Sequence, residues 1–350
     1  MTRLFLALAV VTSCGVAATR VPPLGVSMAE PPLPAVEMAD AGPTARAMTI
    51  ERVDECELPR YIRNDAAGPA VESDVSYGED PRQKYDIAFP ESGRPKALVV
   101  IVHGGGWTSG GKGLFRPTIR MLASLGYAAA SVGYRLASSD SRAFPADLED
   151  VRCALRAVSA RAGGGKTIVL GASAGAHLAA MAALTRDAPQ FDGACPDHKP
   201  LRIDGAVLYY APLEIDRAPQ RYVPIMRQAV DELLYGVRRV ACARNARCAG
   251  PDGGIDEDGG DWLARAELAT PSRIVTHDAP PMLLLAGTED HIVPLADARD
   301  FAAALERSQV PHLLVEVPGQ KHGFPVIGYE PSLRTSSCTM LRFLSRIAAE

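Results

Sequence analysis

The sequence has no excess of basic residues and no block of charge of one sign. Its 37 Lys and Arg stand against 41 Asp and Glu, for a formal net charge of −4. Proteins that bind nucleic acid gather Lys and Arg on one surface to neutralise the phosphates. We therefore predict no nucleic-acid partner.

The sequence also lacks the spacing of a metal site. It contains no C-x-x-C motif and no closely paired histidines. One acidic stretch holds Asp256, Asp258 and Gly259, as in part of an EF-hand loop. The first and twelfth ligand positions would then be Gly254 and Arg265, so the match fails. We predict no metal and no other cofactor.

The apolar run at the N-terminus, Leu4–Val11, is too short to cross a bilayer, but it follows Arg3 and has the length of a signal-peptide core. Two processing routes are open. Ordinary cleavage would follow the small residues at 16–18, whereas lipoprotein-type cleavage would precede Cys14 in V-T-S-C. We assign the signal peptide to residues 1–18, with possible lipoprotein-type cleavage before Cys14, and either route predicts an exported protein. It would be secreted, periplasmic or tethered to a membrane by a lipid on Cys14.

The stretch after the signal peptide, residues 19–48, is rich in Pro and Ala and has no helical or strand periodicity. Such a segment is typical of a disordered, solvated tether. We assign residues 49–350 to one folded domain. Within it, residues 212–270 are expected to form a long irregular excursion near the site.

Strand and helix patterns alternate through the folded domain. We expect strands at 84–89, 96–102, 127–132, 167–170, 205–210, 281–285 and 312–317, and helices at 113–125, 148–158, 174–184, 295–306 and 333–348. This alternation predicts an α/β fold with a mostly parallel sheet and helices on both faces. Functional sites in such sheets lie at the carboxyl ends of the strands.

The stretch Thr167–Gly175 reads T-I-V-L-G-A-S-A-G. A G-x-S-x-G turn between a buried strand and a helix is typical of a nucleophile elbow, which holds the serine hydroxyl outward. The pattern can arise by chance in a chain with 31 glycines, so its weight comes from the strand before it and the helix after it. Ser173 is the candidate nucleophile.

A serine hydroxyl needs a base to take its proton. His322 lies in a glycine-flanked loop after the last strand, a position from which a side chain can reach across strand ends, and His291 is its main competitor. Asp290 follows the strand at 281–285 and is the candidate for orienting the imidazole, with Glu289 as the neighbouring alternative. The order Ser173, Asp290, His322 is the order expected of an α/β-hydrolase.

Backbone amides are available for a developing oxyanion. Ala174 follows the nucleophile and supplies one N–H. The run His103-Gly-Gly-Gly-Trp107 follows a continuous aliphatic strand, and its glycines let the backbone approach a ligand without a side chain in the way.

Six motifs, in order and at similar spacing, make residues 75 to the end resemble the α/β-hydrolase fold, specifically carboxylesterases of the hormone-sensitive-lipase-like and feruloyl-esterase-like groups. The motifs are His103–Trp107, Gly133–Leu136, Phe144–Asp150, Gly171–Leu178, Asp290–Pro294 and Gly319–Phe324. The resemblance implies Ser173, Asp290 and His322 as a catalytic triad, with Gly105, Gly106 and Ala174 as oxyanion-hole donors. The sequence departs from the family at Ala172, where relatives often carry His or Asp, and at Ala176, commonly Gly.

The function predicted from these features is hydrolysis of small-molecule carboxylic esters through an acyl-enzyme. No apolar run suggests an interfacial lid helix with exposed aromatics, so we expect short-acyl esters rather than long triglycerides. Residues 50–75 and 212–270 are expected to build the substrate pockets. Two alternatives remain: an amidase, peptidase or formamidase that uses the same triad, and an inactive binding protein that keeps the fold.

Apart from Cys14, six cysteines remain, an even number that suits disulfides in an exported chain. They are Cys56, Cys153, Cys195, Cys242, Cys248 and Cys338. The helix expected at 148–158 has its apolar stripe on the side away from Cys153, so we expect this cysteine to be bonded to a covering segment. Cys242 and Cys248 are close enough in sequence to close a small loop.

Overall fold

The structure, a computed structural model, describes residues 68–138, 141, 143–196, 199–237, 260–328 and 331–350. The chain divides into two compact units, residues 1–40 and 41–350, and all the described residues belong to the second. The predicted signal peptide and tether lie outside the described residues. So do the acidic stretch at 251–259 and the cysteines at 14, 56, 242 and 248.

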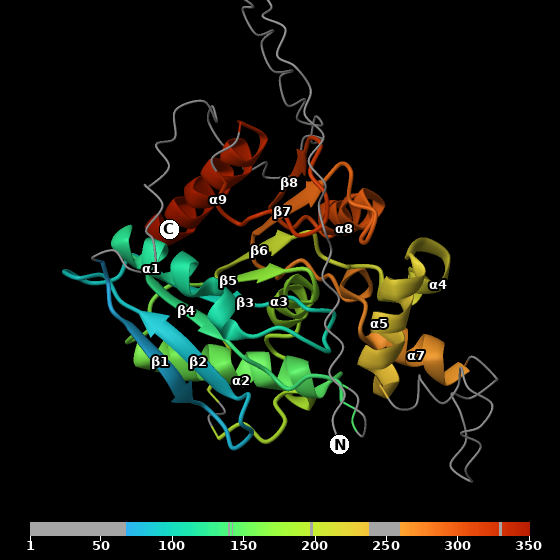
Figure 1. Cartoon of the computed structure of the whole chain (residues 1–350), viewed down its shortest axis with the longest axis horizontal. Coiled ribbons are helices and arrows are strands. Elements are labelled where there is room, and N and C mark those ends of the chain that lie inside the picture. Colours follow the sequence, from blue (N-terminus) through green and yellow to red (C-terminus); the bar gives the residue numbers. More distant parts are fainter. Residues whose placement is uncertain (1–67, 139–140, 142, 197–198, 238–259, 329–330) are drawn as a thin grey trace, which may run out of the picture. The chain divides into compact units, whose positions relative to one another are not determined.

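The fold is built on one eight-stranded sheet with the strand order β1-β2-β4-β3-β5-β6-β7-β8 (Figure 1). The strands are β1 Val71–Ser76, β2 Lys84–Ala88, β3 Leu98–Val102, β4 Ala128–Val132, β5 Thr167–Ala172, β6 Gly205–Tyr209, β7 Met282–Gly287 and β8 His312–Val317. β1 and β2 pair antiparallel, and β3 to β8 run parallel. The carboxyl ends of β3, β5, β6, β7 and β8 therefore meet at one edge of the sheet.

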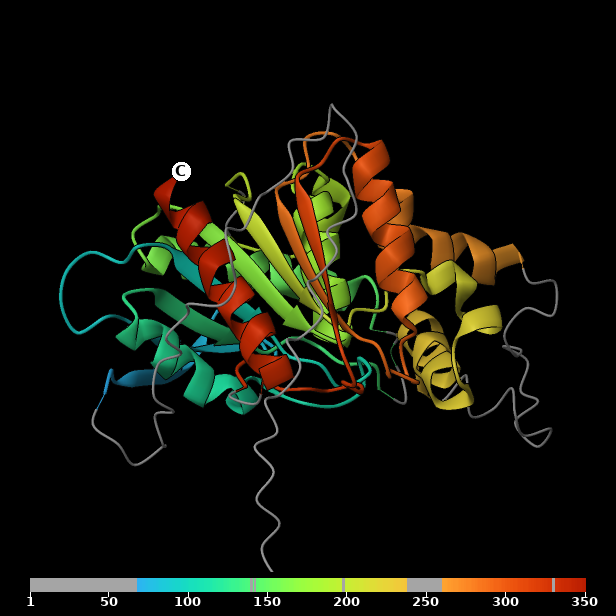
Figure 2. The ribbon, with the colours of Figure 1, turned by 90° about the horizontal axis from the view of Figure 1, so that it is seen from above.

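Helices cover both faces of the sheet. The main ones are α1 Arg116–Ser124, α2 Ala146–Arg161, α3 Ala174–Leu184, α8 Leu295–Arg307 and α9 Pro331–Ala349. α2, α3 and α8 pack on one face and α1 and α9 on the other, and Figure 2 shows α8 and α9 on either side of the last strands. Alternate residues of β3 point to the two cores: Val100 to the first, Val99 and Ile101 to the second.

The predicted α/β architecture is confirmed, and most expected elements agree with the observed ones to within a few residues. The antiparallel edge strand β1 was not predicted. Its burial pattern is mostly exposed and its pairing with β2 is interrupted by a bulge, so its sequence shows no regular alternation.

The prediction that residues 212–270 form an irregular excursion is wrong for the part that the structure describes. That part contains α4 Ala218–Arg221, α5 Pro224–Tyr235 and α7 Gly260–Leu268, with a short 3₁₀ turn at Ile215–Arg217 (Figure 1). α5 has Pro224 at its first position and buries Met226, Val230, Leu233 and Leu234, an i, i+4, i+7, i+8 pattern. The helix is therefore held by its apolar face.

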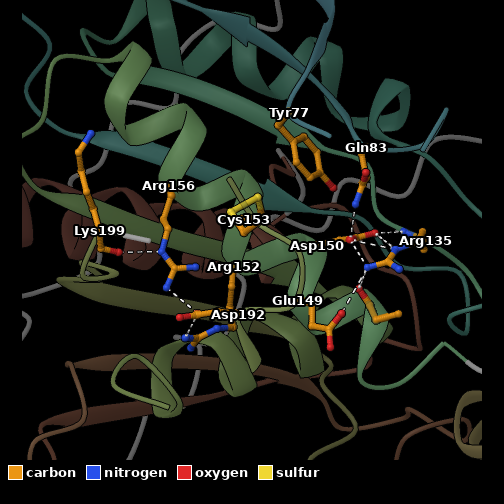
Figure 3. The surroundings of a disulfide bond; sticks show 12 residues. Tyr77, Gln83, Arg135, Glu149, Asp150, Arg152, Cys153, Arg156, Asp192 and Lys199 are labelled. Atoms are coloured by element: carbon orange, nitrogen blue, oxygen red, sulfur yellow. Dashed lines mark hydrogen bonds and ion pairs between the residues drawn. A yellow bond between two sulfur atoms is a disulfide. The ribbon is translucent and has the colours of Figure 1, made fainter. Parts of the chain in front are cut away.

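A disulfide joins Cys153 on α2 to Cys195, with their Cα atoms 5.4 Å apart. Cys195 lies in the segment that covers α2, which confirms the expectation for Cys153. Beside the bond, Arg152 and Arg156 both donate to Asp192 Oδ1 at 2.6 Å (Figure 3). Cys338 is disulfide-bonded as well.

Within the described residues, no helix is both long enough and apolar enough to cross a membrane.

Candidate active site

Ser173 lies on a sharp turn between β5 and α3. Its backbone has φ 54° and ψ −125°, a left-handed conformation that is uncommon for a residue other than glycine. The turn is held because the Ser173 N–H donates to the Tyr209 carbonyl at 2.9 Å, while the Ser173 carbonyl accepts from the amide of Ala176 at 2.8 Å. The strained turn presents the hydroxyl at the carboxyl edge of the sheet.

Two glycines make this turn sterically feasible. A Cβ at Gly171 would lie 2.3 Å from the Gly175 carbonyl oxygen, and a Cβ at Gly175 would lie 2.2 Å from the Val102 carbonyl oxygen. Both distances are shorter than the contacts that non-bonded Cβ and oxygen atoms make in proteins. Glycine at these positions therefore lets α3 begin directly against β3 and β5.

Ser173 Oγ lies 2.9 Å from His322 Nε2, and His322 Nδ1 lies 2.8 Å from Asp290 Oδ2. Because Nδ1 faces a carboxylate oxygen, it carries the proton, and Nε2 is free to accept the serine proton. The other oxygen of Asp290, Oδ1, accepts from the amides of Ile292 and Val293 at 2.8 and 2.9 Å. These amides fix the orientation of the buried carboxylate.

The structure does not bring the two competing residues into this chain of hydrogen bonds. Glu289 and His291 flank Asp290, but their side chains are exposed to solvent. Successive residues in the turn after β7 point in different directions, and only Asp290 of the three meets the imidazole.

The glycine loop after β3 lies against the serine. A Cβ on Gly104 would lie 3.2 Å from Ser173 Cβ. Gly105 and Gly106 have positive φ values of 123° and 58°. Within the loop, the Gly105 carbonyl accepts a hydrogen bond from the Ser109 amide at 3.0 Å. Within the described residues, the N–H groups of Gly105 and Gly106 have no backbone or side-chain acceptor.

The loop is fixed from behind by two buried histidines. His103 stacks on Tyr134 at 4.3 Å, and the Tyr134 hydroxyl donates to the His103 carbonyl at 2.8 Å. Trp107 Nε1–H donates to His177 Nδ1 at 3.3 Å, and His177 Nε2–H donates to the carbonyl of Ala269. Burial lowers the pKa of both imidazoles to about 4, so both are neutral at neutral pH. They serve as structural supports of the loop.

Comparison with known proteins assigns this chain to a protein family. The family model BD-FAE matches residues 85–305. The chain belongs to the BD-FAE family. It is 31% identical to Esterase LipC of Mycobacterium tuberculosis, over 72% of this chain and 60% of that protein. It is 28% identical to the probable carboxylic ester hydrolase LipM of the same organism, over 80% of this chain and 62% of that protein.

The fold agrees with that of solved esterases. An inhibited Esterase B from Lactobacillus rhamnosis superposes with a TM-score of 0.63 at 23% identity, over 85% of this chain and 90% of that one. This likeness confirms the α/β-hydrolase fold. The chain spans about 60% of the length of the curated relatives it matches.

In this BD-FAE domain, the segment between β6 and β7 reaches the glycine loop. A Cβ on Gly106 would lie 3.5 Å from the Cβ of Ala229, so α5 lies beside that glycine. Ile225, one turn earlier on the same side of α5, is 69% exposed. Part of the expected pocket-forming segment thus flanks the site, while the residues expected to contribute at 50–67 lie outside the described residues.

One carboxyl group near the loop's supports has no complete set of partners. Asp147 of α2 is fully buried, and its Oδ1 accepts from the Leu148 amide at 2.8 Å. Its Oδ2 is buried without a hydrogen bond in the described part of the chain. Burial raises the pKa of this carboxyl to about 8, so it is largely protonated at neutral pH.

In the described part of the chain, no group of three or more His, Cys, Asp or Glu side chains is arranged to hold a metal ion.

Proposed function

We propose that this protein hydrolyses carboxylic esters, with Ser173 as the nucleophile. The observation that carries the proposal is the continuous hydrogen-bond chain from Ser173 Oγ through the His322 imidazole to Asp290. It combines a nucleophile, a base and an orienting carboxylate in the relation that acyl-transfer chemistry requires. Membership of the BD-FAE family and similarity to named esterases support ester hydrolysis.

The first half of the reaction makes an acyl-enzyme. Ser173 Oγ attacks the ester carbonyl carbon while His322 Nε2 takes the hydroxyl proton. The carbonyl oxygen becomes an oxyanion, for which the amides of Gly105, Gly106 and Ala174 are the proposed donors. The intermediate collapses, and His322 returns the proton to the leaving alcohol.

The second half releases the acid. His322 removes a proton from water, the hydroxide attacks the acyl carbon, and the proton returns to Ser173 Oγ as the ester bond breaks. Throughout, Asp290 stabilises the imidazolium and holds its ring in place. These steps use only side chains and amides of this chain.

We further propose short-acyl, small-molecule esters as substrates. The small Ala229 beside Gly106 and the exposed Ile225 support an open, apolar wall on the α5 side of the site. Amide hydrolysis is the competing activity, because the same residues would attack an amide carbonyl.

Fluorophosphonate labelling of the purified full-length protein tests the nucleophile. We expect stoichiometric modification of Ser173, located by peptide mass spectrometry, and none in Ser173→Ala. Hydrolysis of p-nitrophenyl esters with acyl chains of two to eight carbons, compared with the matching anilides, tests the bond cleaved. An unlabelled Ser173 in folded protein would refute the proposal, and faster anilide cleavage would favour the amidase.

We also propose that the protein is exported. The Cys153–Cys195 disulfide supports this, since such bonds persist in oxidising compartments. Fractionation of the native host with the intact mass of the mature N-terminus tests the route. A diacylglycerol-modified Cys14 supports the lipoprotein route, cleavage after residue 18 supports secretion, and an unprocessed protein in the cytosol contradicts both.

A further inference from the structure

Tyr210 has a strained backbone for which the proposed chemistry gives no reason. It follows β6 directly and has φ 39°, a left-handed value that is rare for a bulky aromatic residue. Such a conformation persists only where surrounding contacts enforce it. Here the Tyr210 amide donates to the Leu285 carbonyl of β7 at 2.7 Å, which ties the residue to the strand that precedes the turn with Asp290.

The strained backbone brings the Tyr210 ring against the proposed base. The Tyr210 and His322 ring centroids lie 4.9 Å apart at an interplanar angle of 66°, an edge-on contact. The ring also contacts Phe324, two residues beyond His322, at 5.0 Å and 69°. The loop that carries the imidazole is thus packed on Tyr210 at two points.

The neighbouring residue contacts the nucleophile. The Tyr209 carbonyl accepts the Ser173 amide, and the Tyr209 hydroxyl donates to the Val326 carbonyl at 3.0 Å. The dipeptide at the end of β6 therefore touches the serine turn on one side and the histidine loop on the other.

We infer that Tyr210 is a positioning residue, whose ring sets the orientation of the His322 imidazole toward Ser173 Oγ. This inference rests on the proposed hydrolase function. Asp290 fixes the imidazole through one nitrogen only, so rotation about that hydrogen bond must be limited by packing. The Tyr210 ring, itself largely buried, supplies that limit. A misplacement of about 1 Å at a reacting group can cost about a hundredfold in rate.

The test separates the effect of the Tyr210 ring from the effect of the strained Tyr210 backbone. Tyr210→Phe keeps the ring. Tyr210→Leu removes the ring and keeps a side chain that disfavours positive φ. Tyr210→Asn removes the ring and tolerates positive φ, so it folds without the backbone penalty. Tyr127→Leu is the matched control, because Tyr127 is a buried tyrosine of the same core, remote from Ser173.

We expect Tyr210→Phe to keep kcat within about threefold of the unmodified protein. Tyr210→Leu and Tyr210→Asn should lower kcat and the rate of fluorophosphonate labelling of Ser173 at least about tenfold. KM should stay within about threefold of that of the unmodified protein, because the Tyr210 ring acts through His322 and does not bind the substrate. Tyr127→Leu should lower thermal stability and leave kcat unchanged.

Two results would overturn the inference: full kcat in Tyr210→Asn, or an equal loss of kcat in Tyr210→Phe and Tyr210→Asn. Both results are interpreted only if fluorophosphonate labels Ser173 in the unmodified protein. If the unmodified protein neither labels nor hydrolyses esters, it is the proposed function that fails. The two failures are therefore distinguishable in one set of measurements.

Discussion

Ser173 Oγ and His322 Nε2 lie 2.9 Å apart, although 149 residues separate them in the sequence. The contact exists because β5 and β8 end at the same edge of the sheet, with β6 and β7 between them. The proposed active site is therefore a product of sheet assembly. Activity should disappear together with tertiary structure in a single transition.

Replacement of Asp290 by Asn should nearly abolish ester hydrolysis. The amides of Ile292 and Val293 would retain the side-chain oxygen, so the NH₂ group would face His322 Nδ1. Nδ1 would then accept a hydrogen bond, and Nε2 would carry the proton and could no longer act as base. We expect kcat to fall by about 10⁴-fold.

Steady-state kinetics on a short p-nitrophenyl ester measure this effect, with Glu289→Gln as the matched control. That exposed neighbour should keep activity within about twofold of the unmodified protein, as expected for surface substitutions. The assignment of Asp290 is wrong if the control loses activity and the Asn variant keeps it.

Gly175→Ala should destabilise the fold. The added methyl group would lie 2.2 Å from the Val102 carbonyl oxygen and 2.4 Å from that of His103, and both are backbone atoms. We expect a loss of about 3 kcal/mol in the free energy of unfolding. Denaturant titration measures it. Gly111→Ala is the control, because its extended backbone and open surroundings accept a methyl group. Equal stability of the two variants would contradict the steric account.

Ala229→Phe should narrow the range of acyl chains accepted. Because the Ala229 Cβ lies beside Gly106, a ring at this position would occupy space next to a proposed oxyanion donor. We expect the ratio of kcat/KM for hexanoate over acetate esters to fall by about tenfold. Arg227→Ala, on the exposed side of the same helix, should leave the ratio unchanged. An unchanged profile in Ala229→Phe would remove α5 from the substrate site.

Asp147→Asn should change how stability depends on pH. The folded-state pKa of Asp147 is raised to about 8, while in the unfolded chain this carboxyl ionises near pH 4. Between these values the folded protein binds more protons, so the free energy of unfolding falls as pH rises. Since Asn does not titrate, the stability of Asp147→Asn relative to the unmodified protein should grow from pH 4.5 to 8, by on the order of a few kcal/mol.

Denaturant titrations at several pH values give this difference. His103 and His177, with pKa values lowered by burial, act in the opposite direction, but they are present in both proteins and cancel. The exposed Asp187→Asn is the control for removal of a charge. A difference that does not vary with pH would show that Asp147 is ionised in the folded protein.

Local signals predicted the framework of the site. The aliphatic run of β3, the glycine turn around Ser173 and the loop around His322 each combine a strand pattern with residues that turns require. Their places along the chain then follow from the alternation of strands and helices. The meeting of Ser173, Asp290 and His322 agrees with that prediction, whereas their chemical roles stay a proposal.

Features that depend on distant partners were not predictable. Tyr210 is unremarkable in sequence, because its contacts with His322 and Phe324 exist only once β8 has joined the sheet. Cys195 could not be paired with Cys153 by spacing alone. For α5, however, the periodic pattern of Met226, Val230 and Leu233 was present, and it was outweighed by the Gly- and Asp-rich residues that follow.

The described part of the segment between β6 and β7 adds no strand to the sheet, yet it supplies the side chain that flanks Gly106. Its ends are anchored by Tyr210 at the sheet and by the His177 hydrogen bond to Ala269. Such a segment can be exchanged without changing the strands of the sheet. Libraries that vary only the exposed positions of α5 would sample new selectivities on a scaffold whose reacting groups stay untouched.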